Sequence, residues 1–429
     1  MSSKLDQLLA RLCPNGVEYR PLKHFATVSR GGSFQKKDFV PSGFPCIHYG
    51  QIHTKFDIFV DQAITFLTND VAERQRKAES GAIIMAVTSE NLDDVCKAVA
   101  WLGNSEGAVS GHSAIIHHHQ NPKYLSYYFN SIAFSAQKRK LAHGTKVIEV
   151  TPNDLLEVCV PVPPLEVQNE IVRILDKFTE LTAELTAELT ARRMQYEYYR
   201  DLLLSFDNRD RGGYDSFIQR INRVDSHSIT FKRFGDMAKI QRGASPRPIH
   251  RFLTTDASGI NWIKIGDVKP GDKFVGSTSE RITQEGAKMS RFVQEGDFIL
   301  SNSMSFGRPY IVRESGCVHD GWLVISNFRK KFTSDFLYHL LSSDGPQRTM
   351  RQKASFGGAV QNLNADIVRD LILPVPPLPI QEKIAEVLDR FDTLCNDLTS
   401  GLPAEIEARK KQYEYYRDKL LNFKPLKHA

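Results

Sequence analysis

The chain has 429 residues, of which 41% are hydrophobic, and its 56 Lys and Arg against 50 Asp and Glu give a net charge of +6. This composition is that of an ordinary globular protein with room for two domains, and it includes neither an apolar run of membrane-spanning length nor the apolar core of an N-terminal signal peptide. The six cysteines lack the spacing of a disulfide framework or a metal site, which predicts a protein of the reducing cytoplasm.

Two long motifs occur twice along the chain. PVPPLEVQNEIVRILDKF begins at Pro161 and is matched by PVPPLPIQEKIAEVLDRF from Pro374, while RRMQYEYYRDLLLSF from Arg192 is matched by RKKQYEYYRDKLLNF from Arg409. A repeat of about half the chain length predicts two copies of one structural unit. We therefore expect four parts in this order: a head at 1–160, a helical arm at 161–213, a second head at 214–373 and a second arm at 374–429.

Short apolar runs bounded by Gly, Pro, Asn and Ser predict strands in both heads. In the first head they are AIIMAV from Ala82 and SAII from Ser113, and in the second DFIL from Asp297 and WLVI from Trp322. KYLSYYFNSI and DFLYHLLSS are amphipathic and predict helices, the first of them capped by Asn121. The second head carries 23 Lys and Arg against 16 Asp and Glu, a surplus that favours contact with nucleic acid.

In each arm the apolar residues recur at steps of three and four, which is the spacing of coiled-coil helices. Because such a stripe is unstable in water, we expect the two arms to pack on each other within the chain as an antiparallel coiled coil. The predicted fold is therefore α+β, with two similar strand-rich domains, two long helices and a pseudo-twofold repeat. Gly401 and Pro403 predict a kink or break in the second arm. The residues expected to pair the arms are Ile171, Phe178, Leu181, Leu185, Leu189, Tyr199, Ile384, Phe391, Leu398 and Tyr416.

The first arm contains TELTAELTAELTA at residues 179–191, a repeat of four residues. One unit lengthens a helix by ~6 Å and advances the apolar stripe by ~40° beyond a full turn. Those steps are of the size of a base-pair step in DNA, which rises by ~3.4 Å. Adding or removing one unit would therefore move the heads by a DNA-like step. Slippage of a low-complexity tract without function is the alternative.

These motifs together resemble a known family. The doubled PVPPLxxQ motif, the doubled QYEYYRDxLL ending and the TAEL units are similar to the specificity subunit of type I restriction–modification enzymes, in the subclass with TAEL repeats in the central helix. The resemblance covers the whole chain and is most specific in the arms. It implies that each head is a target-recognition domain reading one half of a bipartite, asymmetric DNA site, and that the arms set the gap between the halves.

The resemblance also implies partners. The chain would be the non-catalytic DNA-specificity subunit of an adenine methyltransferase and endonuclease complex, and its partners would be double-stranded DNA, two methyltransferase subunits and restriction subunits. The chain itself would hold no cofactor, because S-adenosylmethionine, ATP and Mg²⁺ would be bound by those partners.

The sequence has no phosphate-binding loop, no convincing glycine-rich cofactor fingerprint and no HExxH motif. We therefore predict neither catalytic residues nor a metal site, and the three histidines at 117–119 are predicted to form a polar loop. The alternative to DNA recognition is a coiled-coil scaffold or adaptor protein without DNA readout.

The residues that read DNA are expected in loops, because Arg, Asn, Gln, Ser and Thr form the usual hydrogen bonds to base edges. Three pairs of loops occupy matching places in the heads: 29–37 with 241–248, 88–91 with 301–308, and 143–146 with 356–362. Arg30 and Arg242 are equivalent, so they are expected to share a task such as phosphate contact or fold support. The candidate DNA-binding residues are Arg30, Ser33, Lys36, Lys37, Thr88, Asn91, Thr145, Lys146, Gln241, Arg242, Ser245, Arg247, Asn302, Ser303, Arg308, Gln361 and Asn362.

Overall fold

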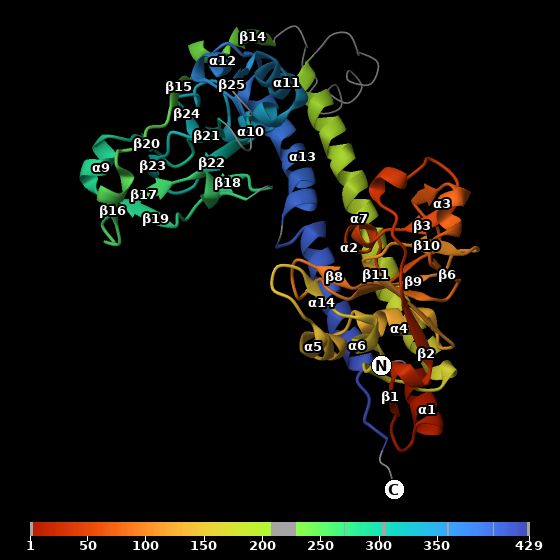
Figure 1. Cartoon of the computed structure of the whole chain (residues 1–429). Coiled ribbons are helices and arrows are strands. Elements are labelled where there is room, and N and C mark those ends of the chain that lie inside the picture. Colours follow the sequence, from red (N-terminus) through yellow and green to blue (C-terminus); the bar gives the residue numbers. More distant parts are fainter. Residues whose placement is uncertain are drawn as a thin grey trace. The chain divides into compact units, whose positions relative to one another are not determined.

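The computed structural model describes residues 3–206, 229–269, 271–302, 306–357, 360–397 and 399–426 (Figure 1). The chain divides into two compact units. Unit 1 comprises residues 1–184 and 407–429, and unit 2 comprises residues 185–406. Each unit therefore contains one head together with a piece of each arm, so both units can be described in the same terms.

Head one of unit 1 is a mixed α/β structure. Its helices are α1 (Ser3–Leu12), α2 (Tyr49–Thr54), α3 (Asn69–Glu73), α4 (Pro122–Phe129), α5 (Ile132–Leu141) and α6 (Pro152–Leu156), with short 3₁₀ turns η1 (Leu22–His24) and η2 (Lys36–Asp38). Its strands are β1 (Tyr19–Pro21), β2 (Ala26–Arg30), β3 (Phe44–Ile47), β4 (Phe59–Val60), β5 (Thr65–Leu67), β6 (Lys77–Ala78), β7 (Ile83–Ala86), β8 (Thr88–Ser89), β9 (Lys97–Trp101), β10 (Gly107–Val109), β11 (Ser113–His118), β12 (Ile148–Glu149) and β13 (Cys159–Pro161).

The strands of head one form two main sheets. One has the order β2-β11-β7-β9-β4 and the other the order β5-β3-β10-β6. Strand β7 is buried on both faces, so alternate side chains enter different cores: Ile83 and Met85 pack on the side of α4, and Ile84 and Ala86 pack with Trp101. A continuous apolar run such as AIIMAV is what a strand covered on both faces requires.

Head two of unit 2 contains a similar set of elements. Its helices are α9 (Gln284–Lys288), α10 (Ser334–Ser342), α11 (Asp344–Lys353) and α12 (Ala365–Arg369), with 3₁₀ turns η5 (Phe234–Asp236), η6 (Ile249–Arg251) and η7 (Ile265–Asp267). Its strands are β14 (Thr230–Arg233), β15 (Lys239–Arg242), β16 (Leu253–Thr254), β17 (Ile260–Ile263), β18 (Phe274–Val275), β19 (Glu280–Ile282), β20 (Arg291–Val293), β21 (Phe298–Ser301), β22 (Pro309–Val312), β23 (Gly316–Val318), β24 (Trp322–Ser326), β25 (Ser355–Gly357), β26 (Val360–Asn362) and β27 (Ile372–Val375).

The sheets of head two follow the same plan as those of head one. The first has the order β15-β24-β21-β22-β18, and the second has the order β16-β19-β17-β23-β20. Matching strands in the two heads therefore occupy matching positions, with β16 as an additional edge strand in head two. The predicted strands at 82–87, 113–116, 297–300 and 322–325 are confirmed as β7, β11, β21 and β24, and the predicted helices as α4 and α10.

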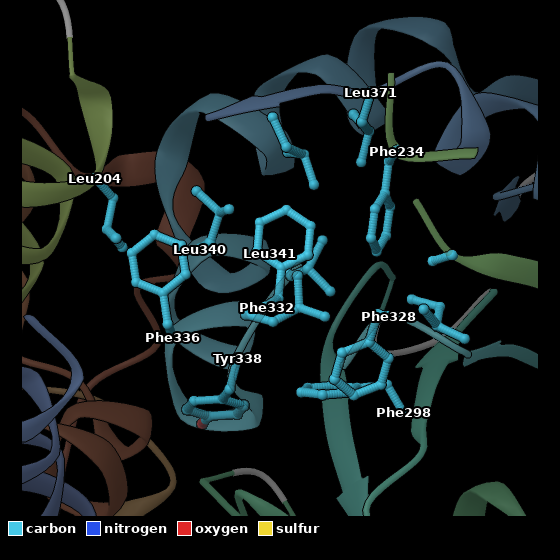
Figure 2. Close-up of a cluster of buried hydrophobic side chains, with 14 of the residues drawn as sticks. Leu204, Phe234, Phe298, Phe328, Phe332, Phe336, Tyr338, Leu340, Leu341 and Leu371 are labelled. Atoms are coloured by element: carbon cyan, nitrogen blue, oxygen red, sulfur yellow. The ribbon is translucent and has the colours of Figure 1, made fainter. Parts of the chain in front are cut away.

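The largest core lies in unit 2 and is rich in aromatic side chains. Phe332, just before α10, and Phe336, in its first turn, stack with their ring centroids 6.3 Å apart. Phe298 and Phe328 meet edge to face at 5.2 Å, and Leu204 of the first arm belongs to the same cluster (Figure 2). Large aromatic groups of this kind contribute most of the burial energy of a core. The core therefore fixes α10, and with it the head, on its portion of the arm.

The first arm is a single helix, α7 (Leu165–Ser205), and the second is divided into α13 (Leu378–Asn396) and α14 (Leu402–Leu420). The expected interruption near Gly401 is confirmed. A side chain at Gly401 would lie 2.5 Å from the carbonyl oxygen of Thr393, so glycine is needed there. Hydrogen bonds from Ser400 and Thr399 lower the pKa of Asp397 to about 2, so its carboxylate holds the turn that separates the helices.

The apolar stripes of the arms pack within each unit. In unit 1 Phe178 stacks on Tyr416 at 5.4 Å, and in unit 2 Phe391 stacks on Tyr199 at 6.0 Å. In both contacts, the phenylalanine that ends the LDKF or LDRF segment of one arm stacks on the last tyrosine of the QYEYY segment of the other arm. In unit 2 the Arg193 guanidinium donates to the Cys395 carbonyl at 3.4 Å, and this contact with the Tyr199 stack gives the antiparallel direction.

The other residues predicted to pair the arms differ in their burial. Ile171 and Ile384 are fully buried in their units, and Leu189 packs against the core of unit 2. Leu181 and Leu185 are half-buried, and Leu398 lies outside the described residues. Within the TAEL tract, the Thr182 and Thr190 hydroxyls donate to the carbonyl oxygens four residues earlier, which satisfies these polar groups without leaving the helix.

The glutamine of the PVPPLxxQ motif joins head to arm in both units. Gln168 is fully buried, accepts a hydrogen bond from the Asn121 backbone at 3.0 Å and donates to the Pro163 carbonyl at 2.7 Å. Gln381 is equally buried and repeats the arrangement, accepting from the Thr333 backbone at 2.9 Å and donating to the Pro376 carbonyl at 2.8 Å. The motif is thus repeated because both joints need the same amide.

None of the helices in the described ranges is long and apolar enough to cross a membrane.

Candidate nucleic-acid interface

In head one, the predicted loops meet at the turn of residues 110–112, which we call the central turn of head one. It connects β10 to β11. The Arg30 guanidinium, at the end of β2, donates to the Gly111 carbonyl at 2.8 Å and pairs with Glu149 at 2.6 Å. Thr88, at the start of β8, bonds the His112 ring at 3.0 Å. Segments that are far apart in sequence, near 30, 88 and 149, are therefore held around one turn.

Glycine follows the arginine in both heads because the chain passes very close to this turn. A side chain at Gly31 would lie 2.2 Å from the Ser110 carbonyl, and one at Gly243 would lie 2.2 Å from the His319 carbonyl. No side chain can be accommodated at such distances. The repeated Arg-Gly pair thus marks the point where each head brings β2 or β15 against its turn.

A hollow of about 550 Å³ adjoins the central turn of head one. It is bordered by the loop after β2, which includes Ser33 and Lys36, by His48 and Tyr49 at the start of α2, and by His112. The Tyr49 ring lies 4.6 Å from the His48 ring and 4.9 Å from the His112 ring. The Tyr49 backbone also donates to the Ser110 hydroxyl at 2.9 Å, so a hydrogen bond ties these aromatic groups to the central turn.

His48 is buried and caps α2. Its Nδ1 accepts a hydrogen bond from the Gly50 backbone at 3.2 Å, so in the neutral ring the proton is on Nε2. Burial, followed by the charges of Lys36 and His112, lowers the pKa of His48. The ring is therefore uncharged at neutral pH, and it supports the hollow as a fixed aromatic wall.

Head two has its turn at residues 319–321, which we call the central turn of head two, and Asp320 is its centre. The Asp320 carbonyl accepts hydrogen bonds from the Arg242 guanidinium and from the Asn302 amide, both at 3.0 Å. Its carboxylate accepts from the Ser245 hydroxyl at 2.9 Å and from the Arg247 guanidinium at 3.2 Å. Four of the predicted DNA-binding residues are thus brought together by one residue that sequence reasoning did not select.

The Asp320 carboxylate is ionised in this setting. Partial burial raises its pKa, but the hydrogen bond from Ser245 and the nearby charges of His319, Arg247 and Arg242 outweigh burial, so the pKa is lowered. A fixed negative charge at this point orients the mostly exposed Arg247 side chain. The guanidinium remains able to donate to a second acceptor, because it has five N–H groups.

The remaining candidates are placed differently. Thr88 and Asn302 are buried and face into the heads, where they hold the central turns. Lys36 and Lys37 lie exposed on η2, and Asn91 bonds Asp94 in an exposed turn. Thr145 and Lys146 are exposed in the loop before β12, Gln241 is half-buried on β15, and Asn362 is exposed at the end of β26. Ser303 and the side chain of Gln361 lie outside the described residues.

Arg308 lies in a different environment within unit 2. It borders a hollow of about 550 Å³ shared with Arg193 and Arg200 of α7, and its guanidinium is 5.7 Å from the ring of Tyr310. Only its backbone approaches the loop of Asn302, through the hydrogen bond from the Ser301 amide to the Arg308 carbonyl. The Arg308 side chain therefore borders the same hollow as two arginines of the first arm.

The prediction of a polar loop at 117–119 is wrong for its first two residues. His117 and His118 belong to strand β11 and pair with Thr27 and Ala26 of β2. Burial lowers the pKa of His118 to about 4, so that histidine is neutral. Antiparallel pairing with β2 extends the strand past the apolar run SAII, which is why the run alone placed its end too early.

Sequence reasoning also missed the central turns themselves. Residues 110–112 and 319–321 are short and match poorly between the heads, so no repeated motif indicated them. Their equivalence is structural: the Val87 backbone donates to the His112 carbonyl at 3.0 Å, and the Asn302 backbone donates to the Gly321 carbonyl at 3.1 Å. The signal that could have found these turns is that their residues differ between the heads although their positions in the fold match.

Comparison with known proteins places the chain in one family. The model of the type I restriction modification DNA specificity domain matches twice, at residues 14–192 and 228–408. A putative type I restriction enzyme specificity subunit of Haemophilus influenzae is 32% identical over 334 residues, covering 75% of this chain and 76% of that protein. The EcoR124I/EcoR124II specificity subunit of Escherichia coli is 35% identical over 278 residues, covering 61% of each chain.

Solved structures share the fold. A chain from a study of complex assembly and conformational transition of the type I R-M system aligns with a TM-score of 0.62 at 18% identity, over 95% of this chain and 98% of that one. The S subunit of a type I restriction–modification system from M. genitalium aligns with a TM-score of 0.50 at 13% identity, over 95% and 96%. At these identities the likeness shows the α+β fold with its repeated domains.

Proposed function

We infer, from the premise that this chain belongs to the family of type I restriction–modification DNA specificity subunits, that its two heads read the two halves of one bipartite, asymmetric DNA site. The family supplies the specificity subunit of such systems, and catalysis lies on other subunits. In this division of roles the heads contact DNA, and the arms set the gap and bind the partner subunits.

One observation carries the division between the heads. The two heads repeat the same strand order and the same arginine-to-turn hydrogen bond, but the turns differ: Gly111 and His112 in head one stand where head two has Asp320 and Gly321. A common frame with unlike polar groups at one place is what two readers of different sequences need, because hydrogen bonds to base edges decide sequence preference.

The exposed candidates around each turn would make the contacts to DNA. Lys36, Lys37 and Lys146 in head one are exposed cations suited to phosphates, which bind Lys and Arg without regard to sequence. Arg247 in head two is 83% exposed and oriented by Asp320, which suits a bidentate contact with guanine. Arg30 and Arg242 would serve mainly to support the turns.

The arms would set the gap and bind partners. Packing of α7 on α14 in unit 1 and on α13 in unit 2 supports a helical spacer, and an exposed QYEYYRD face on each arm would offer two similar docking surfaces for methyltransferase subunits. Met194, Tyr198 and Tyr415 are each more than 60% exposed on these arms. Restriction subunits would join the complex, which would work in the cytoplasm, and S-adenosylmethionine, ATP and Mg²⁺ would be bound by the partner subunits.

Reconstitution tests this function. The chain mixed with its partner methyltransferase subunit should methylate adenine at one bipartite sequence, which is read by sequencing the modified bases of random DNA. Neither subunit alone should do so. Methylation at the same sites without this chain, or complexes whose DNA binding does not weaken with salt, would favour the scaffold alternative.

The TAEL tract provides a second test. Deleting residues 186–189 removes one four-residue unit from α7 and shortens the helix by ~6 Å. We expect the unspecified spacer of the methylated site to become shorter while both half-sites are kept. Glu188→Ala, which keeps the helix length and removes only a pair with Arg192, should leave the spacer unchanged. An active deletion variant with the original spacer would contradict the ruler.

A further inference from the structure

The hollow beside the central turn of head one contains polar and aromatic groups that the fold alone does not require. His112 is exposed at its border, Tyr49 is half-exposed, and the hydroxyl of Thr88 bonds the His112 ring from the buried side. Resting on the proposed function, we propose that His112, positioned by Thr88, reads one base pair of head one's half-site, with Tyr49 as the apolar and stacking wall beside it.

The geometry around His112 gives its ring a fixed orientation. Nδ1 lies 3.0 Å from the Thr88 hydroxyl, and Thr88 is only 6% exposed. The ring plane is also restrained by Tyr49, whose centroid is 4.9 Å away at an interplanar angle of 55°. With Nδ1 engaged toward the protein, Nε2 is the polar atom that remains to meet a ligand. A single oriented hydrogen-bonding group is the requirement for reading the edge of a base.

The surroundings of the hollow suit DNA as the ligand. Lys36 lies on its border and is exposed, so a cation is available for the phosphate next to the base. Rings also border the hollow: the Phe34 ring lies 6.4 Å from the His48 ring, and the His48 ring lies 4.6 Å from the Tyr49 ring. Apolar ring faces beside one polar atom match a base-pair edge, in which hydrogen-bonding atoms alternate with carbon, such as the thymine methyl group.

Head two shows that these groups are not part of the common frame. The position of His112 is occupied by Gly321 and that of Tyr49 by Ile265, which begins η7 after a cap at Lys264 built like the cap at His48. Both cap residues donate the same backbone hydrogen bond to a side chain three residues on: the His48 amide donates to the Gln51 side chain at 2.9 Å, and the Lys264 amide donates to the Asp267 carboxylate at 2.8 Å. The two heads therefore share this backbone, but head two lacks the tyrosine ring and the imidazole. This is expected for side chains that read one particular DNA sequence.

The test replaces His112 in the full chain and maps methylation by the reconstituted complex. His112→Ala should lose discrimination by about 10- to 100-fold at one position of head one's half-site, with head two's half-site unchanged. His119→Ala is the matched control, since His119 is also exposed and follows the other end of the same strand, β11. It should methylate the parent sequence.

Two more variants separate reading from support. Thr88→Val removes the bond that orients the ring and should relax the same position as His112→Ala. His112→Asn keeps a hydrogen-bonding side chain and should change the preferred base at that position, which loss of structure would not do. Melting curves and complex assembly identify variants that fail to fold, and in that case His112→Asn alone decides.

The inference is overturned if the His112→Ala and His112→Asn complexes methylate the parent sequence with parent selectivity, or if the relaxed position lies in head two's half-site. That outcome would leave the bipartite site of the parent complex intact. Failure of the proposed function would be seen earlier, as a parent complex that shows no bipartite sequence.

Discussion

Head one and head two place opposite chemistry on the same backbone frame. Around the turn of head one stand the rings of His48, His112 and Tyr49, while the turn of head two holds an ionised aspartate that accepts hydrogen bonds from Ser245 and Arg247. The arginines that close both turns, and the glycines after them, are the same. The comparison teaches that in this chain the repeated residues build joints, and the residues that differ between matched places are the ones to test for recognition.

The joints between head and arm should be the most sensitive part of the common frame. Gln168→Ala and Gln381→Ala each leave buried backbone groups without partners, and we expect each to lower the free energy of unfolding by about 3 kcal/mol. Gln352→Ala, an exposed glutamine on α11, should change it by less than about 0.5 kcal/mol. Urea unfolding measures the loss, and faster hydrogen exchange at the Asn121 and Thr333 amides would locate it.

Similar effects of the two joint variants are the expected result, since the two amides make matching bonds. A loss confined to one of them would mean that the two joints are alike in shape but differ in strength.

A smaller effect should come from the carboxylate next to each joint. Asp389 accepts hydrogen bonds from the fully buried His339 at 2.8 Å and from Lys273 at 2.6 Å, and in unit 1 the matching Asp176 accepts from Tyr127 and Lys123. Burial raises the pKa of Asp389, but the bonds from His339 and Lys273 outweigh burial, so it is lowered.

A carboxylate whose pKa is lower in the folded state stabilises the fold above its unfolded pKa, and this contribution is lost as the pH falls through the folded value. Asp389→Asn should therefore cost about 2 kcal/mol at pH 7, and the difference from the parent should shrink below about pH 4. Unfolding at several pH values measures it. Asp335→Asn, which removes only the more exposed partner of Lys273, is the control and should cost about 0.5 kcal/mol. A constant difference between pH 7 and pH 3 would contradict the assignment.

The smallest effects are expected where the arginines close the turns at the surface. Arg30→Ala removes two interactions, with Gly111 and Glu149, and should cost about 1 kcal/mol. Arg242→Ala removes the hydrogen bond to the Asp320 carbonyl and should cost about 0.5 kcal/mol. If these residues support the turns, both variants should keep the parent half-sites in methylation mapping. A relaxed base position in either variant would instead assign that arginine to reading.

Much of the frame could be predicted from the residues because it is encoded locally. The step of three and four predicted α7, and Gly401 with Pro403 predicted the break in the second arm. Asn121 predicted the start of α4, where the Tyr124 amide donates to the Asn121 side chain at 3.0 Å. The loops of head one could be paired with those of head two because the repeat reaches into them. What was missed depends on tertiary structure: His112 meets Thr88 only because β11 pairs with β7, and Asp320 gathers Arg242 and Ser245 from one segment and Asn302 from another.

The assembly of unit 1 from residues 1–184 and 407–429 has a consequence for the order of biosynthesis. Leu420 and Leu421 are buried in the core of head one, and the Val17 backbone donates to the Lys424 carbonyl at 2.9 Å. Unit 2, in contrast, is one continuous stretch. A ribosome therefore releases every residue of unit 2 before it supplies the last segment of unit 1, so the unit that is begun first completes its fold last. An early stop codon beyond residue 406 would leave unit 2 whole and head one without its closing segment.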